Sequence, residues 1–368
     1  MSAVAFIRRE PFLAVSLVSA ALFLIFGGSW LTDLSNPAWF GFMFAWLFLA
    51  ILCSAFAAVR HAEGLAVLLG EPLGTLVLTL SVTGIEVMVI AAVMYTGPVG
   101  STLARDSMFA VIMIVLNGMV GLSLLLGGLK HHEQEYNLQG TNAFLALILP
   151  LSVLSLVLPN YATTELGPVF SNFQAGFLVI ISIGLYAIFL AVQNVRHRAY
   201  FLGPAKGKKE SEHPGHEAIS LRYHGVMLAL YLLPLVVLSK QLALPIDYGI
   251  QVLKAPSALG GFLVAVLILS PESLGAGRAA LANQLQRSVN ILMGSVLATI
   301  SLTVPAVLLI GLFTHQHIVL GLNPVNVVLL LLTLILSSLT FASARTNVLH
   351  GAVHLLLFLA YLMLIFES

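Results

Sequence analysis

Eleven long apolar runs dominate the sequence, and each has about the length that crosses a membrane. A transmembrane helix needs about 20 consecutive apolar residues. The runs span about 11–31, 39–59, 72–95, 107–129, 141–159, 170–194, 220–240, 256–277, 288–313, 325–343 and 347–366. With 59% hydrophobic and only 8% charged residues, the 368-residue chain falls outside the soluble classes. The sequence therefore predicts an all-α polytopic membrane protein of about 11 transmembrane helices.

Basic residues are distributed unevenly between the two predicted sides of the membrane. With the N-terminus inside, eleven spans place thirteen of the sixteen Lys and Arg residues on the inner side and only Arg105, Lys240 and Lys254 outside. This bias follows the positive-inside rule. The first run follows two arginines but lacks a small-residue cleavage site, which predicts a retained anchor rather than a signal peptide. We expect a cytoplasmic N-terminus and an external C-terminus.

Only two acidic residues lie deep in the predicted spans, Glu86 and Glu272, because the other thirteen of the fifteen Asp and Glu fall in loops or near span ends. A carboxylate at membrane depth is costly and as a rule faces a bundle interior or a wet cavity. No basic residue lies at a comparable depth in the predicted spans, so each glutamate needs a bound cation or a proton. The alternative, for either one alone, is a protonated glutamate hydrogen-bonded between helices.

The surroundings of the two glutamates repeat along the chain. Gly74 precedes Glu86 by twelve positions, and Gly260 precedes Glu272 by the same spacing. If an odd number of spans separates the two segments, they cross the membrane in opposite senses. This is the plan of inverted-repeat transporters, whose coupling-ion sites lie near the midplane. The repetition favours one cation or proton site shared by Glu86 and Glu272.

Hydroxyl groups and a proline stand close to the two acids. Thr83 shares a helix face with Glu86 through the three-residue spacing, whereas Ser270 and Pro271 directly precede Glu272. Pro271 lacks the N–H that would bond the carbonyl four residues back. We therefore expect a helix break that leaves a carbonyl oxygen for a hard cation such as Ca²⁺. The hydroxyls either line the ion path or pack helices and bond back to carbonyls.

Three further polar residues lie in the spans that follow the two glutamate segments. Asn117 lies in the fourth span, and Asn290 and Ser295 belong to the start of the ninth. An amide oxygen is a good ligand for a hard cation and an amide is also an ordinary interhelical hydrogen-bonding group, so both roles stay open for Asn117. Asn290 and Ser295 would face the same cavity if the ninth span pairs with the eighth. All three are candidate supporting ligands.

The only sizeable polar segment, residues 196–224, is rich in Gly, Pro and charge, and its composition predicts a cytoplasmic linker between two halves of the chain. Four histidines and three glutamates in it could instead form a weak cation or pH sensor. Their spacing matches no structural zinc pattern. The single cysteine, Cys53, excludes a disulfide or a Cys-based metal site within one chain.

The sequence does not carry the marks of an intramembrane enzyme. It has neither a nucleophile with a base nor a metal-binding pair such as H-E-x-x-H. His350 and His354 are four apart in the last span without a carboxylate at that depth, which favours core or hydrogen-bonded histidines. We expect a transporter without a cofactor, whose partners are transported cations, protons and the lipid bilayer rather than nucleic acid. A passive channel is the alternative.

Several motifs closely resemble bacterial ChaA-type calcium/proton antiporters of the cation/Ca²⁺ exchanger superfamily. The motifs are GEPLGTLVLTLSVTGIEV, RDSMFAVIMIVLNGMVGLSLLLGG, LILSPESLGAGRAALANQLQRSVN, GSVLATISLTVPAV and RTNVLHGAVHLLLFLAYLMLIF. The resemblance covers nearly the whole chain. It implies an extra N-terminal helix in residues 1–35, a first five-helix repeat in 36–195, the polar linker in 196–219 and an inverted second five-helix repeat in 220–368.

The resemblance also implies a function. Such proteins are secondary active antiporters of the bacterial inner membrane that exchange Ca²⁺ for protons by alternating access. One glutamate in each repeat carries Ca²⁺ or protons, and these two match Glu86 and Glu272 here. The resemblance is to a branch whose members also exchange Na⁺, and sometimes K⁺, for protons. A Na⁺(K⁺)/H⁺ antiporter that uses the same site is therefore the alternative.

Overall fold

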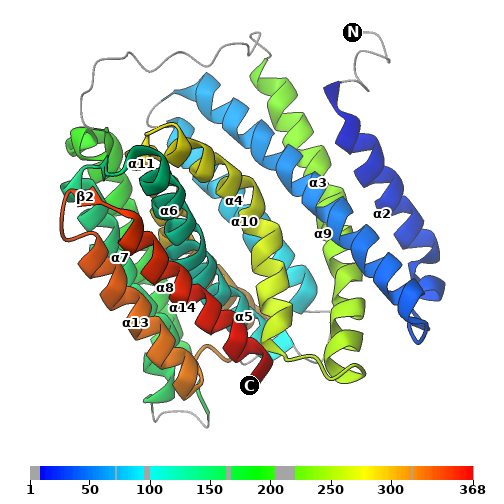
Figure 1. The fold of residues 1–368 in the computed structure, drawn as a ribbon. Helices are drawn as coiled ribbons and strands as arrows, with labels where there is room; N and C mark the ends of the chain where they lie inside the picture. Colours follow the sequence, from blue (N-terminus) through cyan, green and yellow to red (C-terminus); the bar gives the residue numbers. More distant parts are fainter. Residues whose placement is uncertain are drawn as a thin grey trace. The chain divides into compact units, whose positions relative to one another are not determined.

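The computed structural model of the protein describes residues 9–70, 73–94, 100–162, 167–203, 220–315 and 318–367. Within these residues ten helices are long and apolar enough to cross a membrane, and α13 (Pro324–Thr340) is a shorter apolar helix (Figure 1). The prediction of an all-α polytopic membrane protein with about 11 spans is therefore confirmed.

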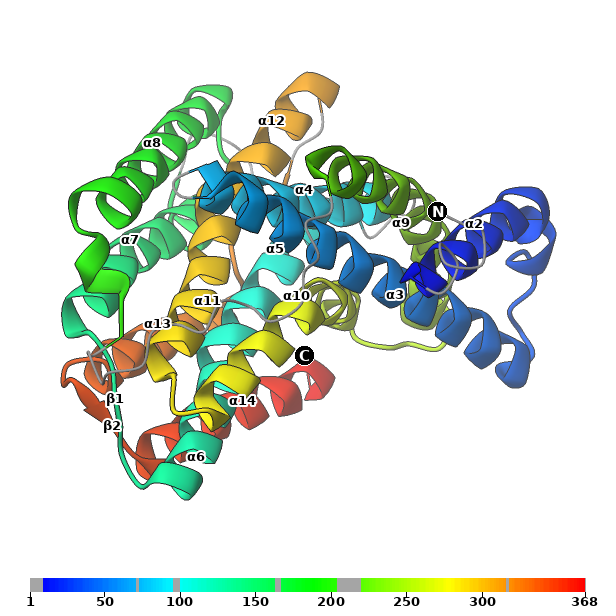
Figure 2. The same ribbon diagram turned by 90° about the horizontal axis from the view of Figure 1, so that it is seen from above.

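The chain forms two compact units, and each unit draws on both halves of the sequence. In its described part, unit 1 contains α2 (Pro11–Trp30), α3 (Pro37–Leu69), α4 (Leu73–Met94) and α9 (Leu221–Gln251). α3 packs against the other three helices, and α9 also contacts α2 and α4. α3 and α9 lie side by side in both views (Figures 1 and 2).

Two helices of unit 1 are longer than a membrane span requires. α3 has 33 residues and α9 has 31. At 1.5 Å per residue, both exceed the hydrocarbon thickness of about 30 Å by roughly half. α9 continues through Pro234 and Pro245, although the apolar pattern ended this span near residue 240. The ends of α3 and α9 therefore carry polar residues beyond the apolar spans.

Capping side chains fix where several helices begin. The caps accept a backbone N–H from the first turn of the helix that follows, and they are Asn36, Asn137, Ser171, Ser220 and Asn323. At Ser171 the contact is reciprocal, because the Gln174 side chain accepts the Ser171 N–H in a capping box. Pro37 and Pro324 follow their caps at a position where a helix does not need an N–H.

Unit 2 contains the other described elements. They are α5 (Gly100–Ile112), η1 (Met113–Met119), α6 (Val120–His131), β1 (Gln134–Glu135), α7 (Leu138–Leu156), η2 (Leu158–Asn160), α8 (Asn172–Ala191), η3 (Val192–Arg196), η4 (Arg198–Phe201), α10 (Ala258–Leu281), α11 (Leu285–Ala298), η5 (Thr299–Thr303), α12 (Val304–Thr314), α13, β2 (Arg345–Thr346) and α14 (Val348–Glu367). The π-helical turns η1 and η5 join α5 to α6 and α11 to α12. α10 packs against α5, α6 and α11, whereas α14 packs against α6 and η1.

The two short strands of unit 2 form an antiparallel ribbon. Gln134 pairs with Thr346, and Glu135 pairs with Arg345. The Arg345 guanidinium also lies 3.5 Å from the Glu133 carboxylate and 3.1 Å from that of Glu135. The ribbon therefore ties the loop after α6 to the loop before α14.

The predicted helix break at Pro271 is wrong. α10 is one uninterrupted helix from Ala258 to Leu281, with the proline inside it. Pro271 still cannot donate to the carbonyl of Leu267. The neighbouring Leu267, Ile268 and Leu269 are buried, so packing keeps the backbone helical on the N-terminal side of the proline. The Leu267 carbonyl therefore receives no hydrogen bond from residue 271, although the helix continues through this point.

The first residues of the predicted linker are folded. Arg196 ends η3, and η4 follows directly. Phe201 is buried and packs edge-on against Phe144 and Phe189. Gly140 of α7 passes so close to the Tyr200 carbonyl that a Cβ would not fit there. Residues 204–219 of the predicted linker lie outside the described residues, and its last residues, 221–224, begin α9.

Candidate functional site

Glu86 belongs to the buried face of α4 in unit 1. Its side chain is 4% exposed, and Thr83, three residues earlier, is 6% exposed. Residues three apart lie on one face of a helix, so the two form one polar patch on α4, which packs against α3 and α9. The chain thus buries a carboxylate and a hydroxyl together within a helix apolar enough to span a membrane.

Glu272 belongs to α10 of unit 2 and is half-buried. The hydroxyl of Ser270 donates to the Val266 carbonyl of the same helix at 2.5 Å. This is the back-bonding alternative for that hydroxyl. The Ser270 oxygen keeps lone pairs for a further contact, so its role as a supporting ligand stays a prediction.

The glycines of the two repeats allow close helix packing. A Cβ on Gly74 would meet the Ala66 carbonyl oxygen of α3. A Cβ on Gly261, directly after Gly260, would lie 2.6 Å from backbone atoms of Asp106 and Ser107 in α5. In each unit, a glycine near the start of the glutamate-bearing helix therefore lets that helix lie against its neighbour.

Asn117 is fully buried in η1 and joins three helical elements of unit 2. Its Nδ2 donates to Thr333 Oγ1 of α13 at 2.7 Å, and its Oδ1 lies 3.3 Å from His354 Nδ1 of α14. His354 Nε2 lies 3.0 Å from Thr340 Oγ1. The expectation that His354 is a hydrogen-bonded core histidine is confirmed. For Asn117 the contacts favour the interhelical role, and a ligand role stays a prediction.

Asn290 of α11 also has partners at both ends of its amide. Nδ2 donates to the Phe201 carbonyl at 2.7 Å, and Oδ1 accepts from Gln286 Nε2 at 2.8 Å. The amide thereby holds η4 against α11. Ser295 is half-buried further along the same helix. Whether Asn290 or Ser295 also contacts a cation stays a prediction.

Side chains from α6 and β1 hold the end of α10. Lys130 Nζ and His131 Nε2 lie 3.0 and 3.1 Å from the Leu281 carbonyl oxygen. Gln134 Nε2 donates to the Ala280 carbonyl at 2.9 Å. Basic side chains at a helix C-terminus satisfy its last carbonyls and stabilise it. These contacts anchor the C-terminal end of α10, the helix that carries Glu272, within unit 2.

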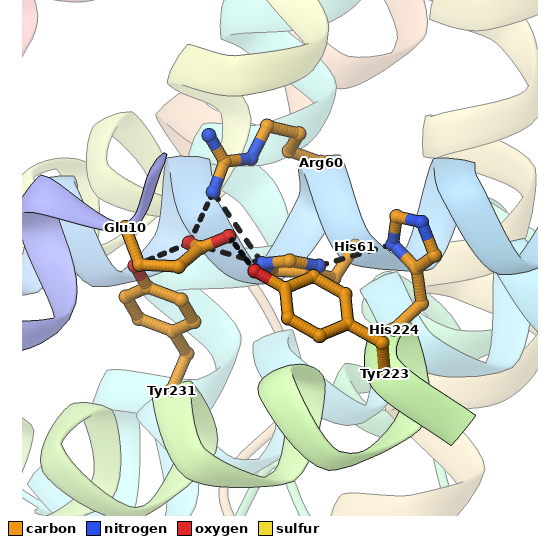
Figure 3. A network of polar contacts seen from close by, with 6 residues as sticks. All are labelled: Glu10, Arg60, His61, Tyr223, His224 and Tyr231. Carbon is orange, nitrogen blue, oxygen red and sulfur yellow. Dashed lines mark hydrogen bonds and ion pairs between the residues drawn. The ribbon is translucent and has the colours of Figure 1, made fainter. Parts of the chain in front are cut away.

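A buried charged network in unit 1 was not predicted from the sequence. It consists of Glu10, Arg60, His61, Tyr223, His224 and Tyr231, and is called the Glu10 network below (Figure 3). The Glu10 side chain is 2% exposed, pairs with Arg60 and accepts hydrogen bonds from Tyr223 at 2.8 Å and Tyr231 at 2.9 Å. Its partners lie on α3 and α9, far along the chain. The sequence alone therefore places Glu10 only among the acidic residues in loops or near span ends.

The charge state of Glu10 follows from these contacts. Burial raises the pKa of the Glu10 carboxyl, but the Tyr223 hydrogen bond, the Arg60 charge and the Tyr231 hydrogen bond outweigh it, and the pKa lies below its ordinary value. Glu10 is therefore a carboxylate at neutral pH. It is the acceptor at the centre of the network.

Comparison with known proteins agrees with this architecture. The family model of the sodium/calcium exchanger protein matches residues 39–195 and 223–367. The chain is 43% identical over 321 residues to the sodium-potassium/proton antiporter ChaA of Escherichia coli, which covers 86% of this chain and 87% of that protein. Native YfkE has a similar fold, with a TM-score of 0.74 at 19% identity over 97% of this chain and 100% of YfkE. The H⁺/Ca²⁺ exchanger CAX has a TM-score of 0.66 at 16% identity over 96% of this chain and 88% of CAX.

The family match covers most of the chain, and the ChaA relative matches it nearly from end to end. The chain therefore belongs to the sodium/calcium exchanger family, as a ChaA-type antiporter of the cation/Ca²⁺ exchanger superfamily.

Proposed function

We propose that this antiporter exchanges Ca²⁺ for protons across the bacterial inner membrane, and that Glu86 and Glu272 bind either the cation or protons. The observation that carries the proposal is the burial of Glu86 beside Thr83 in a membrane-crossing helix, together with a second glutamate at the matching position of the sequence repeat. In this proposal residues 36–195 and 220–368 are inverted five-helix repeats, the N-terminus is cytoplasmic and the C-terminus is external.

Coupling follows from the cost of an empty site. Two ionised carboxylates in a medium of low dielectric constant are strongly destabilised unless a cation or protons neutralise them. The site therefore changes its access only when it is loaded. Cation movement in one direction then requires proton movement in the other, which is antiport rather than channel flux.

The charge of the two carboxylates suits one divalent cation. Ca²⁺ takes oxygen ligands from carboxylates, carbonyls and water. The Thr83 hydroxyl is a first candidate for a neutral ligand, because its Oγ1 is buried and has no hydrogen-bond partner in the described part of the chain. The Leu267 carbonyl, which Pro271 cannot bond, is a second. The amides of Asn117 and Asn290 would have to give up contacts to serve as ligands.

Exchange of Na⁺ or K⁺ for protons is the second candidate function. The relative at 43% identity carries the name sodium-potassium/proton antiporter, and this observation favours monovalent cations. The same two glutamates would serve, with one or both protons displaced in each cycle. The proton-coupled mechanism is common to both candidates, and the two differ in the cation that displaces the protons.

Cation-induced proton release from everted membrane vesicles tests both candidates. Vesicles with this chain are energised until a pH-sensitive dye is quenched, and Ca²⁺, Na⁺ or K⁺ is then added. Release by Ca²⁺ supports the leading proposal, and release by Na⁺ or K⁺ alone supports the second. Vesicles from cells that lack this chain control for leakage. Release equal to this control for all three cations would overturn both candidates.

A further inference from the structure

The Glu10 network brings two histidines of unit 1 into direct contact. His61 Nδ1 of α3 lies 3.1 Å from His224 Nδ1 of α9. On the other side of its ring, His61 Nε2 lies 3.3 Å from Glu10 Oε2. His61 is 2% exposed and His224 is 6% exposed. Figure 3 shows carboxylate, imidazole and imidazole in one chain of contacts.

A contact between two Nδ1 atoms has room for one proton. One ring donates the hydrogen and the other accepts it with a lone pair. In the tautomer in which His61 Nε2 donates to the Glu10 carboxylate, His61 Nδ1 accepts from His224 Nδ1–H. In the tautomer in which His61 Nε2 accepts from Arg60 Nη2 at 3.4 Å, His61 Nδ1 donates to His224 Nδ1. Either way one hydrogen fills the contact between the two rings. If both imidazoles become charged, each Nδ1 carries a hydrogen and two donors face each other across 3.1 Å. The contact cannot survive a second positive charge.

Charged and titratable groups surround the histidine pair on the segments packed around it. Within the network, Glu10 pairs with Arg60 of α3 and accepts from the neutral hydroxyls of Tyr223 and Tyr231 on α9, and Arg9 lies over the Tyr223 ring. The exposed side chains of Glu63 and Arg222 lie two residues from His61 and His224 in the sequence. The described part of α4 adds only Glu86, which lies beyond the middle of that helix. Among the described residues at this end, three arginines (Arg9, Arg60 and Arg222) against two glutamates (Glu10 and Glu63) leave a positive balance. The surroundings therefore accept one imidazolium beside Glu10 and oppose a second.

The pair is also where the first turn of α9 docks on α3. Gly64 lies one turn after His61, and a Cβ on Gly64 would overlap the His224 imidazole. The His224 ring therefore lies directly on the backbone of α3. Ser220 caps α9 immediately before this turn, so the docked turn is also the point where the chain enters α9 from the predicted linker.

We propose that His61 and His224 form a proton-binding site separate from the two transport glutamates, and that a second proton on this pair releases the first turn of α9 from α3. The site responds to the acidity of the predicted cytoplasmic side. It uses no residue of the proposed exchange mechanism and does not depend on which cation is carried.

Thermal unfolding of the purified full-length chain between pH 8 and pH 5 tests the proposal. We expect the wild-type Tm to fall by several degrees once the pH drops below about 6.5, where an ordinary imidazole gains a proton. His224→Gln and His61→Gln keep a hydrogen-bonding side chain but cannot gain the charge, so either variant should remove most of the fall. An equal fall in both variants and the wild type would overturn the proposal.

A control and a local measurement make this test specific. His315→Asn removes an exposed imidazole from the end of α12, at a φ of 56° that asparagine tolerates, and should keep the wild-type fall. Met227→Cys in a Cys53→Ser background reports the buried face of α9 through maleimide labelling. At pH 6 this thiol should react at least three-fold faster than the same thiol combined with His224→Gln. Equal rates would contradict release of the turn, and neither measurement requires transport.

Discussion

Asn117 donates a hydrogen bond to Thr333 across 2.7 Å, and both side chains are fully buried. The bond joins η1 to α13, whereas His354 of α14 meets the other end of the same amide. A π-helical turn shifts its side chains relative to a regular helix. In unit 2 that turn and one amide together set how three helical elements meet.

We expect Asn117→Leu to lower the free energy of unfolding by about 1–3 kcal/mol, because Thr333 and His354 each lose a buried partner. Thermal unfolding and the apparent cation KM should be measured together. Ser338→Ala is the matched control on α13, since its hydroxyl bonds to the Leu334 carbonyl of its own helix. An unchanged Tm with a raised KM would show instead that the amide is a cation ligand.

A pair of glycines in α4 tests the close approach of α3 and α4. Gly74→Ala should cost about 1–3 kcal/mol, because a Cβ there would overlap the Ala66 carbonyl. Gly84→Ala in the same helix meets nothing within 4 Å and should be neutral or up to about 1 kcal/mol stabilising through helix propensity. The Tm of the two purified variants checks the order. If Gly84→Ala were the more damaging, the packing described for Gly74 would be wrong.

The stability of unit 1 should depend on acid through Glu10. Because the pKa of this carboxyl is lowered in the folded chain, the ionised form stabilises the fold at neutral pH. That contribution is lost as the pH falls below about 4.3, the ordinary value for glutamate, and through the lowered pKa. Glu10→Gln should lower the Tm at pH 7 and reduce the acid-dependent loss. Glu133→Gln, whose side chain is 60% exposed, is the control. A Glu10→Gln profile parallel to that of the wild type would contradict the assignment.

The sequence predicted the parts of this fold that depend on local composition. Apolar runs located the spans, and the rarity of deep carboxylates singled out Glu86, which is buried in the structure. The burial of Glu10 depends instead on Tyr223 and Tyr231, more than two hundred positions away. The sequence also assigned His224 to a solvated linker, whereas packing on Gly64 makes it part of α9.

Backbone irregularities were the other limit of the sequence analysis. Pro271 predicted a break, but tertiary packing keeps α10 continuous. The π-helical turns η1 and η5 contain no proline of their own. η1 contains Asn117 and Gly118, and Pro305, just after η5, lacks the N–H that would bond the Ser301 carbonyl, but neither feature by itself predicts a π-helical turn. Both turns depend on which neighbours pack around the backbone, and a single sequence does not contain that information in a local pattern.

The central linker should be dispensable for exchange. Replacing residues 206–217 with an equal length of Gly and Ser keeps the connection and leaves Ser220 and His224 in place. Because the composition of this segment is that of a solvated linker, the transport rate should stay within about two-fold of wild type. Proton release from vesicles measures it. A correctly inserted but inactive variant would show that the linker itself gates or senses.

Competition between cation and protons follows if Glu86 and Glu272 act as one site. Mutual repulsion and burial make two carboxylates release their protons in coupled steps. The apparent Ca²⁺ affinity should therefore fall as the pH is lowered, with little change in the maximal rate. Ca²⁺-dependent proton release measured at several pH values checks this. An apparent Ca²⁺ affinity that did not vary with pH would show that Ca²⁺ and protons do not compete for one site.

The most direct test of the exchange mechanism is proton release from vesicles that contain Glu86→Gln or Glu272→Gln at wild-type expression and insertion. A neutral amide can neither release a proton nor hold Ca²⁺ by charge, so each variant should abolish exchange. Glu→Asp at either position should be damaging but less complete, and Glu133→Gln on the exposed loop should be as active as wild type. Robust Ca²⁺/H⁺ exchange, or Na⁺/H⁺ exchange, by either Gln variant would contradict the account.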